Sequence, residues 1–148
     1  METRFSAFAK GGEPITLKQI LDQVGDPPWR WRLSVFEGTS LADADLDLIE
    51  LERKVERAEE GVEISLRSLR ELAGKVDQTI DIHLVAKVSS GGSCAFVVQA
   101  FDSTDWEIWA DDSDVVAVGV FDRVREGAET GVWRSGFGKG AGRGLVET

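Results

Sequence analysis

The sequence has very few of the side chains that carry nucleophilic or metal chemistry, with one cysteine and one histidine among 148 residues. The single cysteine, Cys94, excludes an intramolecular disulfide, which is typical of the reducing cytosol. No charged and then apolar leader opens the sequence, and each apolar run is shorter than the roughly 20 residues of a membrane-spanning helix. We therefore expect a cytoplasmic protein that makes no contact with a membrane.

One histidine and one cysteine also leave little room for a catalytic dyad, which needs both side chains within hydrogen-bond reach. If the predicted hairpin is centred on residues 90–91, Cys94 lies opposite Lys87 and His83 lies opposite Val98. Cys94 and His83 would then be about 14 Å apart, at about 3.4 Å per residue. We expect no catalytic residues, no cofactor and no zinc site, because zinc would need ligands that the chain lacks.

Basic residues are scarce as well, with 17 Lys and Arg against 27 Asp and Glu, and the formal net charge is -10. The phosphates of nucleic acids and anionic membranes need a face on which Lys and Arg are in excess. The sequence indicates no such face. We therefore expect neither nucleic acid nor a membrane as a direct partner.

Acidic residues are gathered in two short stretches that more than account for the net charge. Residues 37–60 hold nine acidic and three basic residues, and residues 101–114 hold six acidic residues and no basic one. Such focused charge can attract a basic partner and speed its encounter, or it can serve only to solubilise the surface. In the second stretch, Asp111, Asp112 and Asp114 precede a predicted helix, where the helix dipole favours negative charge.

The apolar pattern predicts one α+β domain over residues 13–126, between a flexible N-terminal arm at 1–12 and a glycine-rich, disordered tail at 127–148. Its length is sufficient for a single hydrophobic core. Helical periods, with Thr16 and Ser65 as caps, predict helices at 17–24, 45–59, 66–76 and 113–125. Alternating apolar and polar residues predict strands at 29–35, 79–88, 94–101 and 106–110. We expect the last three strands to form an antiparallel β-meander that is packed on one face by helices.

The predicted register sorts the side chains of this meander into two faces. The face expected to pack on the helices collects Ile80, Ile82, Leu84, Val97, Phe101, Trp106 and Ile108. The opposite face collects Asp81, His83, Lys87, Phe96, Val98, Glu107 and Trp109. Because this second set mixes aromatic and charged groups, it suits a surface that binds a partner, or one that the tail or the first strand covers.

The layout of residues 15–122 resembles that of small bacterial proteins of the immunity type. The resemblance is carried by Trp29-Arg30-Trp31 opening a strand, Leu48-Ile49-Glu50 in a helix, Ile64-Ser65 before a second helix, and Phe101-Asp102-Ser103-Thr104-Asp105-Trp106-Glu107-Ile108 near the end. It implies an acidic, non-enzymatic α+β domain that neutralises a toxin by covering the active site of that toxin.

The sequence therefore predicts a protein-binding domain that docks a basic protein, such as a toxin with a phosphate-binding cleft. The predicted partner-binding residues are Asp81, His83, Asp102, Asp105, Glu107 and Trp109. One alternative is a small enzyme or ligand-binding protein that uses clustered carboxylates, including a divalent-metal site among Asp102, Asp105, Glu107 and Asp111. A second alternative is a subunit of a homo-oligomer.

Overall fold

The computed structural model describes residues 1–40, 45–102 and 104–134 of the chain. These residues form a six-stranded antiparallel sheet in the order β1-β6-β5-β4-β2-β3, together with four helices, which confirms the predicted α+β class. The strands are β1 (Glu2–Ser6), β2 (Trp29–Ser40), β3 (Val62–Ile64), β4 (Val76–Val88), β5 (Cys94–Phe101) and β6 (Asp105–Ala110). The helices are α1 (Leu17–Leu21), α2 (Asp45–Arg57), α3 (Leu66–Ala73) and α4 (Val115–Thr130).

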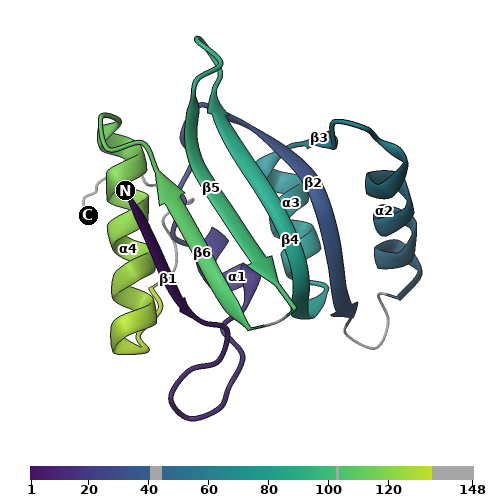
Figure 1. The fold of residues 1–148 in the computed structure, drawn as a ribbon, viewed down its shortest axis with the longest axis horizontal. Helices are drawn as coiled ribbons and strands as arrows, with labels where there is room; N and C mark the ends of the chain where they lie inside the picture. Colours follow the sequence, from purple (N-terminus) through teal and green to yellow (C-terminus); the bar gives the residue numbers. More distant parts are fainter. Residues whose placement is uncertain (41–44, 103, 135–148) are drawn as a thin grey trace.

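The four described helices leave one face of the sheet uncovered. In Figure 1 the sheet lies in front of α1 and α3, with α4 beside β1 and β6 and α2 beyond β2. Only Trp31–Leu33 of β2 pair with β3, and α2 lies beside the part of β2 that follows these residues. We call the sheet face that points toward the viewer in Figure 1 the open face, and the opposite face the core face.

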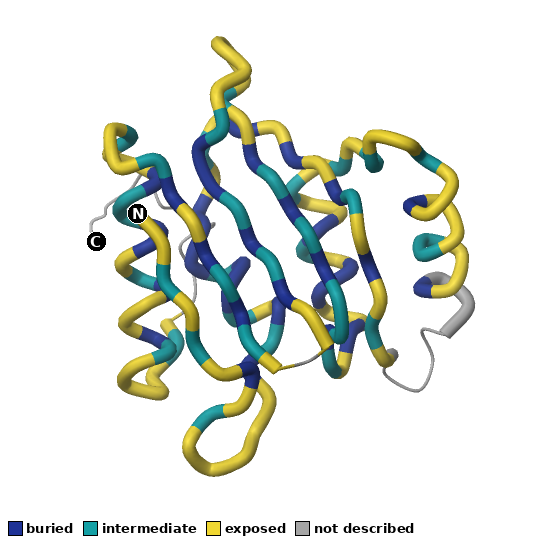
Figure 2. The backbone as a smooth tube through the Cα atoms, in the orientation of Figure 1, coloured by how far each residue is buried: buried dark blue, intermediate teal, exposed yellow. Residues whose placement is uncertain are grey.

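The core face is lined by aromatic side chains from β2, β5 and β6. Trp29 and Trp31 of β2 meet Phe96 of β5, with ring centroids 5.8 Å and 6.5 Å from that of Phe96. Trp106 of β6 is buried and donates its indole N–H to the carbonyl of Ile15 at 3.0 Å. Figure 2 shows that buried and less buried positions alternate along the central strands.

Local sequence signals explain where three of the helices begin. Thr16 caps α1 through a reciprocal box with Gln19, and the Ser65 hydroxyl accepts the N–H of Ser68 at the start of α3. Asp114 caps α4 by accepting two backbone N–H groups. Each cap satisfies donors that a helix start otherwise leaves without a partner, and the predicted caps of α1 and α3 are confirmed.

A one-residue irregularity between β4 and β5 corrects the predicted faces of β5. Lys87 pairs with Cys94 as expected, but the next pair is Ala86 with Phe96, so the partner of His83 is Gln99 rather than Val98. A one-residue shift moves every following side chain to the other face of a strand. As a result, Phe96 and Val98 are buried in the core, whereas Val97 and Phe101, which were predicted to be core residues, reach the open face.

Both predicted ends of the domain are also corrected. Residues 2–6, predicted to be a flexible arm, form the edge strand β1 and pair with β6. At the other end, α4 continues past residue 126 to Thr130, and Trp133 packs on the core. The buried Gln23 side chain holds this segment by donating to the carbonyl of Arg134 at 2.5 Å. The rest of the predicted tail, residues 135–148, lies outside the described residues.

Within the described part of the chain, no helix is both long enough and apolar enough to cross a membrane.

Two glycines of α4 give a matched test of how the C-terminal segment packs. A Cβ atom at Gly127 would lie 2.5 Å from Cε3 of Trp133, whereas the nearest atom to a Cβ at Gly119 would be Nη1 of Arg123 at 3.5 Å. We expect Gly127→Ala to lower the free energy of unfolding by about 1–3 kcal/mol, because Trp133 must move. Gly119→Ala should leave it unchanged or raise it by up to about 1 kcal/mol, because alanine favours a helix.

Urea unfolding of the two variants beside the parent measures both values. Equal effects of the two substitutions would contradict the contact between Gly127 and Trp133.

Candidate functional site

A row of polar side chains crosses four strands in the middle of the open face. Arg4 of β1 forms an ion pair with Glu107 of β6. Glu107 Oε1 also accepts from Nε2 of Gln99 on β5 at 3.2 Å. Gln99 Oε1 lies 2.6 Å from Nδ1 of His83 on β4. The four residues occupy register positions that face one another across the sheet, which is why their side chains meet.

The charge of Glu107 sets the direction of the hydrogen bonds in this row. An ionised carboxylate only accepts, so Gln99 must turn its amide NH₂ toward Glu107 and its carbonyl oxygen toward His83. His83 must then donate from Nδ1, which leaves Nε2 as the acceptor when the ring is neutral. The row therefore holds the imidazole in one orientation and one tautomer.

The Arg4 end of the row is exposed, and its ion pair positions the side chain of Glu107 rather than stabilising the fold. The hydrogen bond from Arg4 to Glu107, and then the charge of Glu107, raise the pKa of the Arg4 guanidinium. Exposed ion pairs of this kind contribute little to folding. Arg4 thus remains charged and holds Glu107 in place on the side opposite Gln99.

The six predicted partner-binding residues lie on this face or at its end. His83 and Glu107 belong to the polar row, while Asp105 and Trp109 flank Glu107 at alternate positions of β6. Asp81 precedes His83 by two positions on β4. The turn between β5 and β6 carries Asp102, whose N–H donates to Oδ1 of Asp81 at 2.8 Å.

Acidic side chains gather at the end of the open face that holds this turn. Glu37 of β2 is the register partner of Asp81, and Asp105 and Asp102 lie on either side of the turn. Asp102 has a φ of 53°, a left-handed conformation that Asp adopts more readily than most residues. Within the described part of the chain, none of these four carboxylates forms an ion pair. Asp105 is one of the charges that raise the pKa of Arg4, and the acidic end is otherwise negatively charged with no ion pair between described residues to offset it.

Other residues of the second acidic stretch serve the helix that follows. Asp114 Oδ1 accepts from the N–H groups of Val116 and Ala117 at 3.0 Å and 3.1 Å. Asp111 accepts from the backbone N–H and the hydroxyl of Ser113, and these hydrogen bonds lower the pKa of its carboxyl group. The predicted local role of acid at this helix start is thus confirmed for Asp114.

Exposed apolar side chains on the open face add contact area. Phe101 is 50% exposed and Trp109 is 36% exposed, and each lies two residues along its strand from the polar row, at the next position on the same face. Val35 of β2, the register partner of His83, is 41% exposed. Aromatic groups beside charged ones are typical of surfaces that bind proteins.

The single cysteine and the single histidine lie far apart in the structure. Cys94 and Gln99, the partner of His83, are five positions apart on β5, which is about 17 Å at 3.4 Å per residue. Burial raises the pKa of the Cys94 thiol, the opposite of what an activated nucleophile needs. No group of three His, Cys, Asp or Glu side chains in the described residues is placed to hold a metal ion.

Sequence reasoning missed three parts of this face. Arg4 was assigned to a flexible arm, although the alternation of residues 2–6 is that of a strand. Gln99 was missed because the irregularity in β5 cannot be read from an alternating pattern. The basic residues Arg30, Arg32 and Lys87 line one pocket, although no basic face was expected. The alternation of both arginines with Trp29 and Trp31 was the available signal.

Comparison of the chain with protein-family models, with curated proteins and with solved structures found no match. The resemblance to immunity-type proteins therefore stays a prediction from sequence layout. What the open face can do has to follow from its own geometry and charge.

The tautomer of His83 tests the geometry of the polar row directly. Because the chain has a single histidine, its imidazole nitrogen signals need no assignment by mutation. In alkaline buffer, we expect ¹⁵N NMR to show protonated Nδ1 and unprotonated Nε2. Gln99→Leu removes the acceptor and should shift the ring toward the tautomer mixture of a free imidazole. A parent protein that already shows this mixture would contradict the row.

Proposed function

We propose that this chain is a non-enzymatic protein-binding domain that docks the basic surface of another protein against its open face. The carrying observation is that a sheet face left uncovered by the described helices holds an ordered polar row beside exposed aromatic side chains. A sheet face that only needs to be soluble does not require side chains linked across four strands. Order before binding reduces the entropy that the side chains lose in a complex.

The negative charge of the acidic end favours a partner with a basic surface. The acidic end, formed by Glu37, Asp81, Asp102 and Asp105, contains no ion pair between described residues, so its field acts on the solvent. Complementary charge steers encounter and raises the association rate, while buried aromatic groups supply most of the affinity. Trp109 and Phe101 are placed to supply this buried area.

An inhibitor of the immunity type is the form of this function that the sequence layout favours. Such a protein would cover a cleft that binds phosphate groups in a basic toxin, because that cleft presents the positive charge that the acidic end complements. In this proposal, His83 and Glu107 give hydrogen bonds at the centre, and Trp109 fills a pocket on the toxin.

A symmetric homodimer through the same face is a second candidate, favoured by one observation. The open face carries Arg30, Arg32 and Lys87 at the end opposite the acidic residues. In a face-to-face dimer whose two-fold axis runs across the strands, each end of one copy meets the opposite end of the other copy, so the charges would be complementary.

Capture of proteins from a cell lysate, with matched charge variants as bait, tests the proposal. The immobilised parent is compared with a face variant carrying Asp81→Asn, Asp102→Asn and Asp105→Asn, and with a control carrying Glu71→Gln, Glu126→Gln and Glu129→Gln. Both variants lose three negative charges, but the control changes only exposed helix positions. We expect a basic protein to be retained by the parent and the control at low salt, and lost from the face variant.

The captured protein is then purified and its affinity measured with Trp109→Ala. We expect the dissociation constant to rise at least about 10-fold, because a central aromatic contact is worth about 1.4 kcal/mol or more. The melting temperature should change little, since Trp109 lies on the open face.

Equal losses in the face variant and the control would contradict docking at this face. A dimer of the free parent in light scattering would support the second candidate.

A further inference from the structure

The end of the open face opposite the acidic end holds a pocket with positive charge. The pocket has a volume of about 220 Å³ and lies over β2, β3 and the start of the β4–β5 hairpin. Three cationic side chains, Arg30, Arg32 and Lys87, line it, and Glu63 of β3 is the single acidic residue among the lining residues. The chain as a whole has a net charge of -10, so this gathering of cations runs against the overall composition. A second such group, Arg53, Lys54 and Arg57 beside Glu50, lies on α2.

The sheet itself forces these cations together. Trp29 and Trp31 occupy the core face of β2, so Arg30 and Arg32 must both extend from the open face. Lys87 of β4 is the register partner of Arg30. Like charges at directly opposed strand positions are destabilising unless something compensates them, and so the pocket favours an anion.

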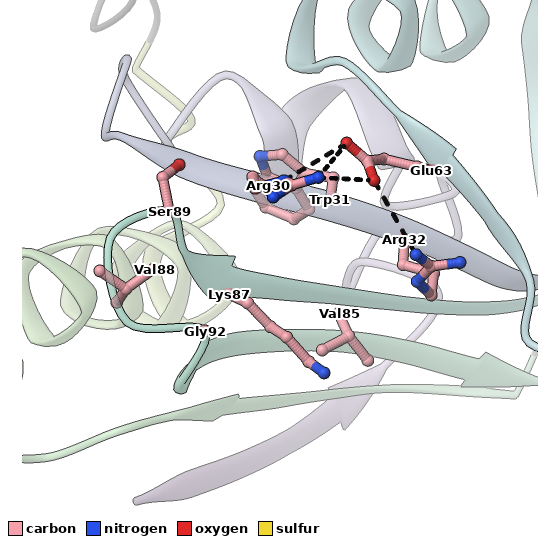
Figure 3. Close-up of a pocket in the computed structure, with 9 residues that line it drawn as sticks. All are labelled: Arg30, Trp31, Arg32, Glu63, Val85, Lys87, Val88, Ser89 and Gly92. Carbon is pink, nitrogen blue, oxygen red and sulfur yellow. Dashed lines mark hydrogen bonds and ion pairs between the residues drawn. The ribbon is translucent and has the colours of Figure 1, made fainter.

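Glu63 compensates only part of this charge. Its carboxylate accepts two hydrogen bonds from Nη2 of Arg30, at 3.0 Å and 3.1 Å, and lies 3.9 Å from Nη2 of Arg32. Figure 3 shows Glu63 reaching both arginines, while Lys87 extends from the neighbouring strand. Lys87 forms no ion pair with any residue that the structure describes. Two positive charges therefore remain in the pocket.

We propose that this pocket binds a phosphate monoester. Its dianion matches the two uncompensated charges, and its three terminal oxygens can accept from Arg30, Arg32 and Lys87 together. The Ser89 hydroxyl, which makes no hydrogen bond with a described residue, lines the pocket as a further donor. A monocarboxylate would gain less, because Glu63 already supplies that chemistry to the arginines.

Glu63 acts in this proposal as the competitor of the ligand. In the free protein Glu63 accepts hydrogen bonds from Arg30, and some of these must break when a dianion binds. The ion pairs of Glu63 are exposed, so their loss costs the fold little. Removing the carboxylate should therefore strengthen binding, whereas removing one of the cations should weaken it.

The test is an ¹H–¹⁵N NMR titration with inorganic phosphate and methyl phosphate at low salt and at a pH where both are mainly dianions. We expect saturable shifts confined to residues around the pocket. Lys87→Gln should weaken binding at least about 5-fold, and Glu63→Gln should tighten it about 3-fold or more. The controls Lys54→Gln on α2 and Glu71→Gln on α3 make the same charge changes away from the pocket and should leave affinity within a factor of two.

Dimethyl phosphate, which carries one charge and resembles the diesters of nucleic acids, separates the sources of phosphate. We expect it to bind at least 10-fold more weakly than methyl phosphate. The proposal is overturned if the shifts do not saturate, if Lys87→Gln and Lys54→Gln have equal effects, or if dimethyl phosphate binds as tightly as methyl phosphate.

Discussion

The one-residue irregularity between β4 and β5 is the constraint on which the rest of this structure depends. Between the pairs Lys87 with Cys94 and Ala86 with Phe96, β5 contains one more residue than β4, namely Ala95. Ala95 is buried, and its carbonyl accepts the N–H of Asp111 at 2.9 Å, so the extra residue is held in place. Such bulges reverse the face to which the following side chains point and are therefore specific structural features.

This reversal determines which side chains meet on both faces of the sheet. On the core face it brings Phe96 against Trp29, with nearly parallel rings. On the open face it places Gln99 between His83 and Glu107, where an amide can donate to one neighbour and accept from the other. Without the extra residue, Val98 would stand in that position and the polar row would be interrupted. One backbone feature thus supports the aromatic core and the ordered surface together.

Much of the fold could be predicted from local chemistry, but the composition of the open face could not. The caps Thr16 and Ser65 and the bounds of β5 follow from hydrogen-bonding side chains and from alternation, which are local properties. Strand β1 was missed although its five residues alternate, because five residues gain their place as a strand only by pairing with β6, about a hundred positions away. The six predicted surface residues come together because β4 and β6 keep their expected faces, whereas the partner of His83 depends on the irregularity in β5.

Cross-strand nuclear Overhauser contacts between the backbone protons of β4 and β5 test this account most directly. The account predicts that His83 faces Gln99 and Ile82 faces Ala100, while Lys87 still faces Cys94. All three pairs together require the extra residue at Ala95. Contacts between His83 and Val98 would show a regular hairpin instead, and both the aromatic cluster around Phe96 and the polar row on the open face would then be wrong.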